Sequence, residues 1–436
     1  MVKVRWIILA VLAQMLHTSA FAFGPHRPHS PELAPRAQNG NFPRGIGVEI
    51  HDINLPDSEL TLIREAGFDW IRTDFAWNYT EPRPGIYDFA NFDEFVKRIQ
   101  RVGIRPIFIL DYTNPLYDQN RAPHSDAGRA AFARWATAAV SHFRGIGAIW
   151  EIYNEPNEKF YWQEKPNADI YFDLAITTAD AIHAQNPGEL VVGPAYATAF
   201  TDFKYLEHLF KRGILNHLDA VSLHPYKFFS GPEDAHSDFD TTRVLIENHQ
   251  APGSQIPIFV SEQGFSSWSR FSDEHAQAKN YAREILFNQS ASIPLTVWYD
   301  WKEDPGHSFP FNLEQHFGLT RSTAQGTLYQ KPVFSAAKTV NHFLKGFQFK
   351  QRFNIGGDGF LLEFRNTWGQ SKYAMWQSNA GRKKYSLPLP EGNYEVMGTL
   401  GEHLGDQNVG SHGLKYEFGN SPVYFMPRRL VGCASH

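Results

Sequence analysis

The sequence predicts an α/β protein: a (β/α)8 TIM barrel with an appended C-terminal antiparallel β-sandwich domain. Between residues 44 and 343, eight short apolar runs of strand type alternate with amphipathic helical stretches. Strands that alternate with helices form right-handed βαβ units and a parallel sheet, and eight such units over roughly 300 residues match a barrel with insertions. After Phe343 the helical periods stop, and β-forming runs broken by Gly, Asn and Pro follow.

The barrel prediction rests on elements that follow one another in a regular order. The first strand leads into the loop sequence HDIN at 51–54. That loop lacks the GxGxxG phosphate-binding turn of a doubly wound open sheet, so the competing fold is excluded. The predicted strands are Gly45–His51, Trp70–Phe75, Arg105–Leu110, Ala148–Tyr153, Leu190–Gly193, Ala220–His224, Ile256–Ser261 and Leu295–Tyr299. Helices are predicted, among others, at Phe92–Val102, Ala127–Arg144, Ala168–Asn186, Tyr205–Arg212, Thr241–Gln250 and Asp273–Ser290.

The C-terminal domain, residues 344–436, is predicted from short β-forming runs. The sequence NIGGDG at 354–359 combines Asn, Asp and three glycines, which is typical of a tight hairpin turn. We interpret it as a turn rather than a phosphate loop. The runs that predict strands here are Gly359–Phe364, Lys372–Gln377, Lys384–Leu389, Tyr394–Thr399 and Leu414–Phe418.

Composition excludes several function classes. Lys plus Arg is 41 and Asp plus Glu is 46, a formal net charge of −5, whereas a nucleic-acid binder would carry a basic excess. Cys433 is the single cysteine, which excludes an intramolecular disulfide, a cysteine-ligated zinc site and a CxxC redox motif. None of the 19 histidines falls in HExxH or another ligand spacing. We therefore expect no cofactor and no catalytic metal.

The N-terminal 43 residues are predicted to lie outside the folded domains. Lys3 and Arg5 precede an uncharged, mostly apolar run, and Ala20-Phe21-Ala22 supplies a cleavage site, so residues 1–22 are typical of a signal peptide. The alternative, an uncleaved anchor, would need about 20 apolar residues, and this run is shorter. Residues 23–43 form a Pro-rich linker. We expect a periplasmic or secreted protein without stable membrane insertion after cleavage.

Two glutamates stand where the chemistry of a parallel barrel is found, at the C-terminal ends of strands. Glu155 follows the predicted fourth strand and Glu262 follows the predicted seventh, so the two should face each other across the barrel mouth. Paired carboxyl groups across a cleft are what acetal hydrolysis needs. One donates a proton to the leaving oxygen and the other attacks or activates water, with retention expected at ~5–5.5 Å separation and inversion at ~6.5–9.5 Å.

These motifs resemble the retaining glycoside hydrolases of clan A, the 4/7 superfamily. The sequence WEIYNEPN at 150–157 is most similar to family 39 and next to family 5. Residues 77–110 also resemble this clan. The segments WYDWK at 298–302 and EQHFGL at 314–319 are similar to family 39 members encoded with bacterial exopolysaccharide genes. The resemblance covers roughly residues 44–343 and implies the same barrel with an appended β-domain.

The resemblance implies roles for individual residues. Glu155 matches the acid/base and Glu262 the nucleophile, whose pKa values must differ because one is protonated when the other is ionised. Arg72 matches the arginine that hydrogen-bonds the nucleophile, although it could instead form a core salt bridge. Asn154 matches the residue that contacts the sugar 2-hydroxyl. Tyr226 matches the aromatic residue that orients the nucleophile.

Further candidates lie at predicted strand ends or in the loops after them. Trp298 matches the platform beneath the reacting sugar. For the rest a substrate contact and a structural role remain open; they are His51, Asp111, Tyr112, Asn114, His224, Trp268, Asp300 and Trp301.

Together these observations predict an exported retaining glycoside hydrolase that acts by double displacement on a polysaccharide or oligosaccharide, with endo action on an exopolysaccharide favoured. The alternatives are an exo-acting β-glycosidase such as a β-xylosidase, transglycosylation, and a non-catalytic polysaccharide-binding or biosynthesis protein.

Overall fold

A closed eight-stranded parallel barrel forms the larger part of the protein, which confirms the predicted fold class. The computed structural model describes residues 42–162, 165–199, 201–228, 230–268, 272–303, 313–323 and 325–428. The barrel strands pair in chain order, and β1 closes against β8. They are β1 (Gly45–Glu49), β2 (Trp70–Ala76), β3 (Arg105–Asp111), β4 (Ile149–Ile152), β5 (Leu190–Ala197), β6 (Ala220–His224), β7 (Ile258–Gln263) and β8 (Leu295–Trp298).

The barrel interior is apolar at the N-terminal end of the strands and polar at the other end. Trp70, Ile107 and Val297 belong to the buried cluster inside the barrel. Because side chains alternate along a strand, the next inward position of β2 is Arg72, which pairs in register with Glu49 of β1. An apolar layer thus closes the lower barrel, and charged groups are confined to the mouth.

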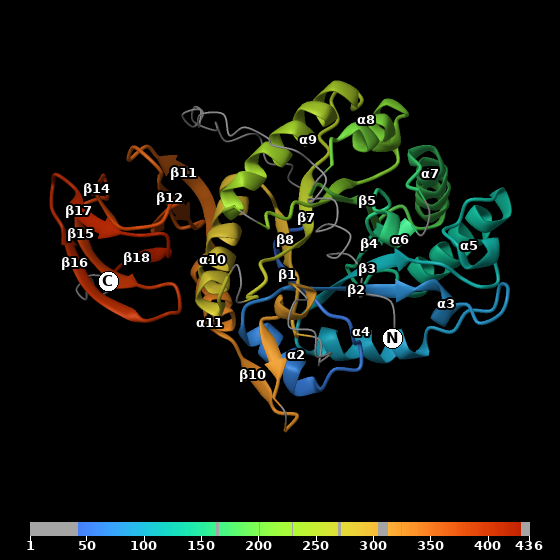
Figure 1. Cartoon of the computed structure of the whole chain (residues 1–436), viewed down its shortest axis with the longest axis horizontal. Helices are drawn as coiled ribbons and strands as arrows, with labels where there is room; N and C mark the ends of the chain where they lie inside the picture. The colour runs from blue at the N-terminus through green and yellow to red at the C-terminus, as the bar shows by residue number, and fades with distance from the viewer. Residues whose placement is uncertain are drawn as a thin grey trace, which may run out of the picture.

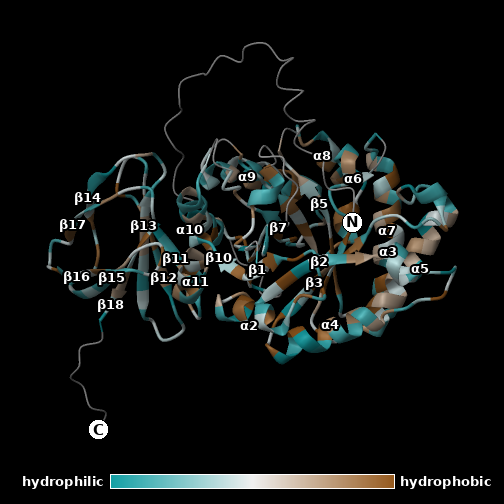
Figure 2. Cartoon of the chain, turned by 60° about the horizontal axis from the view of Figure 1, so that its bottom comes forward, coloured by the Kyte–Doolittle hydropathy of each residue, from teal (hydrophilic) through white to brown (hydrophobic). Residues whose placement is uncertain are grey.

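Helices surround the barrel and carry their apolar side toward it (Figure 1). Figure 2 shows hydrophobic residues alternating with hydrophilic ones along them, as expected for amphipathic helices. No helix among the described residues is long and apolar enough to cross a membrane. The helices are α2 (Asp57–Glu65), α3 (Trp77–Thr80), α4 (Ala90–Arg101), α5 (Asp126–His142), α6 (Lys159–Trp162), α7 (Ala168–Gln185), α8 (Lys204–Lys211), α9 (His236–His249), α10 (Glu274–Ser290) and α11 (Pro332–Leu344). The 3₁₀ helices are η1 (Asp118–Asn120), η2 (Ile214–Asn216), η3 (Pro232–Ala235) and η4 (Leu313–His316).

The sequence missed some of these elements. Helix α11 was not predicted, although Pro332 at its first position is a good helix start. Helix α9 begins at His236, five residues before the predicted start. A short hairpin was also missed; it consists of β9 (Thr320–Ser322) and β10 (Leu328–Gln330). The predicted signal peptide, most of the linker and Cys433 lie outside the described residues.

Antiparallel sheets form the C-terminal domain, which Figure 1 shows beside α10 and α11. The predicted hairpin turn joins β11 to β12, and both Gly356 and Gly357 have positive φ angles there. An apolar cluster that includes Leu361, Tyr385 and Phe425 fills the space between the sheets. In order, the six-stranded sheet contains β11 (Gln348–Phe353), β12 (Gly359–Arg365), β13 (Ser371–Gln377), β18 (Val423–Pro427), β15 (Gly392–Met397) and β16 (His403–Val409). The two-stranded sheet contains β14 (Lys383–Leu387) and β17 (Leu414–Phe418).

A buried polar bracket joins this domain to the barrel. The indole N–H of Trp376 in β13 donates to Glu233 at 2.6 Å, and Arg283 of α10 binds both oxygens of Glu233 at 2.8 and 2.5 Å. Arg283 also donates to the carbonyl of Ser378 at 3.1 Å. The bracket therefore ties the loop between β6 and α9 to both α10 and the C-terminal sheet.

Glu284 of α10 provides a test of the packing. It is fully buried, burial raises its pKa well above the ordinary value, and neither oxygen has a hydrogen-bond partner in the described part of the chain. A carboxyl group whose pKa is higher in the folded than in the unfolded protein lowers the free energy of unfolding as pH rises from the unfolded pKa toward the folded pKa. We expect Glu284→Met to raise the melting temperature, and more at about pH 8 than at about pH 5. Glu247→Met, which replaces an exposed glutamate of α9, is the control. If Glu284→Met raised the melting temperature equally at both pH values, the raised pKa of Glu284 would be contradicted.

Candidate active site

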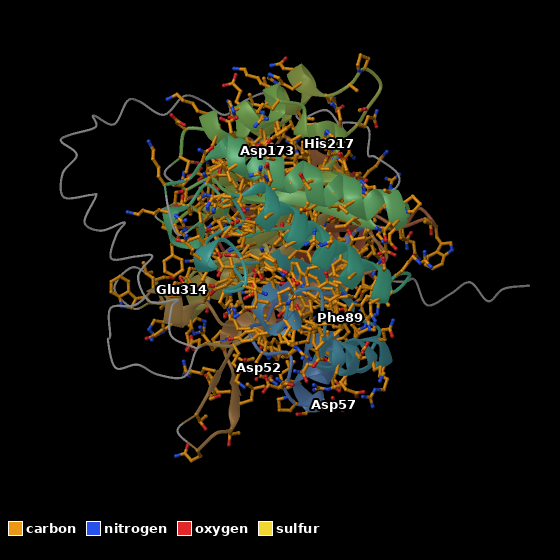
Figure 3. All side chains as sticks on the ribbon, turned by 90° about the vertical axis from the view of Figure 1, so that its right-hand side faces the viewer. Asp52, Asp57, Phe89, Asp173, His217 and Glu314 are labelled. Atoms are coloured by element: carbon orange, nitrogen blue, oxygen red, sulfur yellow. The ribbon has the colours of Figure 1, made fainter. Side chains whose placement is uncertain are left out.

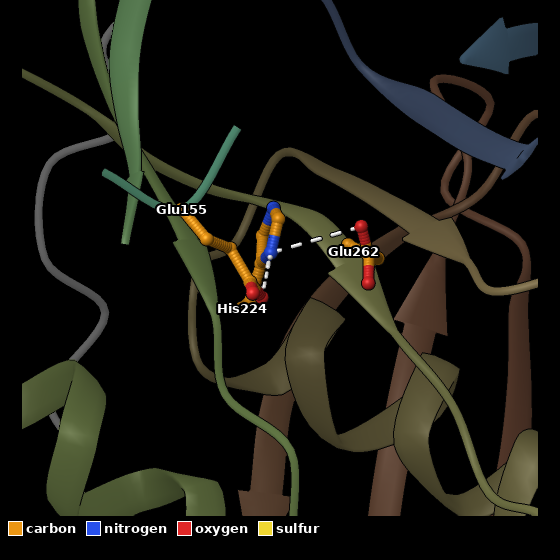
Figure 4. Close-up of side chains that lie close together, drawn as sticks. All are labelled: Glu155, His224 and Glu262. Atoms are coloured by element: carbon orange, nitrogen blue, oxygen red, sulfur yellow. Dashed lines mark hydrogen bonds and ion pairs between the residues drawn. The ribbon is translucent and has the colours of Figure 1, made fainter. Parts of the chain in front are cut away.

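Glu155 and Glu262 meet at the barrel mouth, as the sequence predicted. Glu155 lies three residues beyond β4 with a positive φ of 43°, and Glu262 is the second-last residue of β7. Both are buried, at 8% and 6% exposure. One carboxylate oxygen of each and a ring nitrogen of His224 lie within 4.8 Å of one another, and Figure 4 shows the imidazole between the two glutamates. An approach of this size is in the range of a retaining pair.

Arg72 holds Glu262 in place from below. Its Nη1 donates to Glu262 at 2.8 Å and to Glu49 at 2.6 Å, and its Nε donates to Glu151 at 2.9 Å. Its Nη2 donates to the side-chain oxygen of Asn154 at 2.8 Å. The guanidinium is fully buried, so three carboxylates compensate its charge. Arg72 is thus both a core ion-pair centre and a partner of Glu262, which unites the two roles that the sequence left open.

Tyr226 and Asn154 complete the surroundings of the two glutamates. The Tyr226 hydroxyl donates to Glu262 at 2.6 Å, and its ring is stacked on Phe228 at 5.4 Å. Because the Asn154 oxygen accepts from Arg72, its NH₂ group is left as a donor. The contact of Tyr226 with Glu262 is the one that the resemblance implied, and the role of Asn154 as a donor toward a sugar hydroxyl stays a prediction.

The environments of the two glutamates push their ionisation apart. Burial raises the pKa of Glu155 well above the ordinary value, and the neighbouring charge of Glu262 raises it further. Burial also raises the pKa of Glu262, but Arg72 and the Tyr226 hydroxyl oppose that rise. Glu262 is therefore the group that ionises more easily, and Glu155 is the group that retains its proton. This assignment matches a nucleophile and an acid.

His224 contacts Glu155 in the neutral form. Burial and then the charge of Arg72 lower its pKa well below the ordinary value. Its Nε2 lies 3.0 Å from the hydroxyl of Ser261 and 3.4 Å from Arg72 Nη2. Because a guanidinium cannot accept, we assign Nε2 as the acceptor and the proton to Nδ1, which then donates to Glu155 at 2.8 Å. His224 therefore orients the acid without adding a charge.

Several residues of the mouth were not predicted. Tyr161 of α6 is stacked parallel to Tyr112, with ring centroids 5.8 Å apart, and Tyr299 donates to Glu314 at 2.5 Å. Glu314, labelled in Figure 3, has its pKa raised to about 7 by burial, with Glu262 among the further causes. Tyr112 thus lies at the mouth, which is consistent with a substrate contact, one of the two roles left open for it. The remaining missed residues are Glu49 and Glu151, the other carboxylates on Arg72.

His51 lies on the rim of the mouth, paired with Asp300. Its Nε2 is 3.3 Å from an oxygen of Asp300, and its side chain is 39% exposed. Burial alone would lower its pKa, but the hydrogen bond to Asp300 and the surrounding carboxylates outweigh burial and raise the pKa to about 10. His51 is therefore a cation on the rim.

The structure contradicts the predicted role of Trp298, which cannot be a platform under a sugar. Leu295 and Val297 of β8 point into the barrel, so Trp298 points outward and packs on Tyr281 of α10, with centroids 4.8 Å apart. It is fully buried. The inward position beyond it is Tyr299, whose pKa is raised first by burial, with Glu314, Asp300 and Glu262 adding to the rise.

Three loop candidates have structural roles. The Trp301 indole donates to Glu59 of α2 at 2.7 Å and is 2% exposed, so it anchors its loop and offers no face to a ligand. Trp268 is likewise buried. The Asn114 amide donates to the carbonyl of Glu81 at 3.0 Å. These positions were predicted as possible cleft residues, and for Trp301 the substrate-binding role is wrong.

Glu155, His224 and Glu262 are close enough to share a metal ion. However, the guanidinium of Arg72 already binds Glu262, and its charge opposes a cation there. The group is better suited to proton transfer, although the expectation of no catalytic metal stays a prediction.

The comparisons with known proteins agree with this geometry. The chain resembles a family 39 glycoside hydrolase from the gut symbiont Bacteroides cellulosilyticus WH2, with 22% identity over 88% of this chain and 81% of that chain and a TM-score of 0.74. It resembles a GH39 enzyme from Xanthomonas axonopodis pv. citri, with 18% identity over 89% and 94% and a TM-score of 0.63. It also resembles a monomeric beta-xylosidase from Caulobacter crescentus CB15, with 20% identity over 88% and 95% and a TM-score of 0.62. At these identities the likeness shows the fold.

A family model shows the clan that the motifs predicted, through family 5, which the motifs placed after family 39. The model of cellulase, glycosyl hydrolase family 5, matches residues 42–304, which include Arg72, Glu155 and Glu262. The chain belongs to the cellulase family, glycosyl hydrolase family 5, within clan A of the glycoside hydrolases.

Proposed function

We propose that this glycoside hydrolase is a retaining enzyme that uses Glu155 as acid/base and Glu262 as nucleophile. The observation that carries the proposal is the close approach of the two carboxyl groups, with one oxygen of each within 4.8 Å of the other. A water molecule and a sugar ring together need the wider gap of an inverting pair. Arg72 and Tyr226 both bind Glu262 rather than Glu155, which fits the nucleophile to the β7 position.

The reaction follows in two displacements. Glu155 gives its proton to the glycosidic oxygen while an oxygen of Glu262 attacks the anomeric carbon, so the bond to the leaving group breaks and a glycosyl ester forms. Water then attacks the same carbon and passes a proton to Glu155, and the ester bond breaks to release Glu262 as a carboxylate. His224 donates to Glu155 throughout and stabilises it in its deprotonated state.

The proposed enzyme is exported and cleaves within a polysaccharide, with an exopolysaccharide as the favoured substrate. Export is supported by the N-terminal sequence, and the polymer by the similarity of residues 298–302 and 314–319 to exopolysaccharide-associated members. The exo-acting alternative is supported by the likeness to a protein described as a beta-xylosidase. The two are separated by the products, a ladder of oligosaccharides or a monosaccharide alone.

A substitution of Glu155 tests the proposal. We expect Glu155→Gln to slow hydrolysis of a glycan by roughly 10²–10⁴-fold, because an amide cannot protonate the leaving oxygen. An aryl glycoside whose phenolate leaves without a proton should still form the glycosyl ester, visible as a burst of phenol. A screen of β-glycans and exopolysaccharides for released reducing ends first identifies a substrate. The rate on that glycan and the burst on the aryl glycoside are then measured.

The matched control is Glu158→Gln, another carboxyl of the same loop, whose pKa is raised to about 6 by burial. We expect it to hydrolyse both the glycan and the aryl glycoside at nearly the steady rates of the wild type. Equal slowing of both substrates by Glu155→Gln would contradict the role of Glu155. Binding of a glycan by the wild type without any release of products would instead support a binding protein.

A further inference from the structure

The ends of β1, β2 and β3 build the side of the mouth between β8 and β4. Arg72 points into the barrel and pairs in register with Ile107, and Asp74 pairs with Ile109. Because the inward face repeats every second residue, Asp74 and Asp111 are the next inward positions on their strands. Asp111 is in register with Ala76, two residues beyond Asp74, so the two carboxyl groups lie one inward position apart on neighbouring strands, close enough to interact.

No ion pair to a cation accounts for the burial of Asp111 in the described part of the chain. It is fully buried, and in the described part of the chain its oxygens make no hydrogen bond of good geometry, although Asp74 is close enough for the two carboxyl groups to share a proton. A buried polar group without a partner costs roughly 1–3 kcal/mol, so such a group calls for an explanation. Asp74, in contrast, is exposed to the mouth. The pair consists of one open and one enclosed carboxyl group.

The nearby cations are already engaged. Arg72 binds Glu49, Glu151 and Glu262, and His51 pairs with Asp300. The charge of Arg72 acts on Asp111 and that of Asp74 on His51, but in the described part of the chain no ion pair joins either cation to the two aspartates. Burial, then the charge of Asp74 and a side-chain hydrogen bond with it, raise the pKa of Asp111 well above the ordinary value, and the charge of Arg72 offsets only part of that rise.

An aromatic surface stands beside the pair. Tyr112 directly follows Asp111, and its ring is stacked parallel to Tyr161, with an angle of 13° between the planes. Glu155 and Glu262 are among the groups that raise the pKa of Tyr161, after burial, so this tyrosine lies near the catalytic carboxyls. Flat aromatic faces next to polar groups suit the binding of sugar rings.

We propose that Asp74 and Asp111 form a subsite for a sugar residue that carries a free amino group, with the ammonium placed between the two carboxyl groups. This inference rests on the proposed function and names the class of substrate. An ammonium supplies the missing counter-charge and up to three hydrogen bonds. A uronate would add negative charge where it is uncompensated, and an N-acetyl group would remove both the charge and two donors.

Binding of matched oligosaccharides tests the subsite. The probes are oligomers of β-linked glucosamine and of galactosamine, each before and after complete N-acetylation, titrated by calorimetry into the full chain. Glu262→Gln serves as the background because it stops turnover. Asp74→Asn and Asp111→Asn are added to it, because they remove the charge at nearly constant shape. Asp52→Asn, an exposed carboxylate that follows His51 on the same rim, is the matched control.

We expect at least one free-amine oligomer to bind about tenfold or more tightly than its N-acetylated form. Asp74→Asn and Asp111→Asn should bring that ratio close to one, and Asp52→Asn should preserve it. The proposal is overturned if the N-acetylated forms bind as tightly, if no oligomer of either sugar binds, or if the ratio survives both substitutions. Because binding is measured without turnover, failure of the catalytic proposal would show in the Glu155 experiment and not here.

Discussion

Replacing Glu262 by Gln is expected to lower kcat on any substrate of the enzyme by roughly 10⁴–10⁶-fold, the loss seen when a nucleophile is removed. The amide cannot form the glycosyl ester, and it also loses the ion pair with Arg72 at 2.8 Å. Good leaving groups should not rescue it, because the glycosyl ester cannot form without the nucleophile, whatever the leaving group is. Initial rates on an aryl glycoside and on a glycan measure this loss.

The matched control is Glu314→Gln. Glu314 is also a carboxyl of the mouth that accepts from a tyrosine hydroxyl, as Glu262 does from Tyr226. We expect this variant to change KM more than kcat, because Glu314 has no position in the two displacements. If Glu314→Gln were as inactive as Glu262→Gln, the assignment of the nucleophile would be wrong.

Arg72→Met is expected to reduce both stability and activity. Removing the guanidinium leaves Glu49, Glu151 and Glu262 buried together without a counter-charge, which costs about 3–5 kcal/mol of unfolding free energy. Arg72 lowers the pKa of Glu49 and of Glu262 against the rise that burial causes. Without it both values rise, and the acidic limb of kcat/KM should move to higher pH.

The pH dependence of the stability loss follows from the same shift. Buried carboxyl groups with a raised folded pKa are protonated and neutral at low pH, where they cost the folded protein little. The free energy of unfolding then falls as pH rises toward their folded pKa. Denaturant unfolding of Arg72→Met should therefore show a larger loss at about pH 8 than at about pH 5. Arg283→Met, which also removes a buried arginine, should destabilise the protein without moving the pH profile of kcat/KM. If both variants moved the pH profile of kcat/KM, the shift would come from destabilisation of the fold and not from the lost charge of Arg72.

The barrel and its two glutamates could be predicted because local patterns specify them. Apolar runs that recur with helical stretches determine a parallel barrel, and the C-terminal ends of its strands then locate Glu155 and Glu262. Arg72 was placed by the resemblance, as the match to the arginine that hydrogen-bonds the nucleophile. The family model and the fold agree with that prediction.

Side-chain direction at the end of β8 was the point at which the resemblance misled. Trp298, Tyr299 and Trp301 are close in sequence, and any of them could serve as a platform. The inward face is determined by Leu295 and Val297, which places Tyr299 at the mouth and Trp298 against α10. The alternation of an eight-stranded barrel could have revealed this, because the predicted strand already included Tyr299.

Other residues of the site lie on loop segments whose position in the fold cannot be predicted from their own sequence. Tyr161 lies on the four-residue helix α6, and Glu314 lies on η4 in the long connection after β8. Their return to the mouth depends on packing contacts made across the fold, such as the hydrogen bond from Tyr299 to Glu314. Loops of this kind are determined by the assembled scaffold rather than by their own sequence.

The most direct test of the two-displacement mechanism is the anomeric configuration of the first product. Proton NMR spectra recorded during the first minutes of hydrolysis, before mutarotation, distinguish the two anomers of the released reducing end. A double displacement by Glu155 and Glu262 predicts that the configuration of the cleaved bond is retained. Initial appearance of the inverted anomer would contradict the mechanism, because inversion requires direct attack by water in a single displacement.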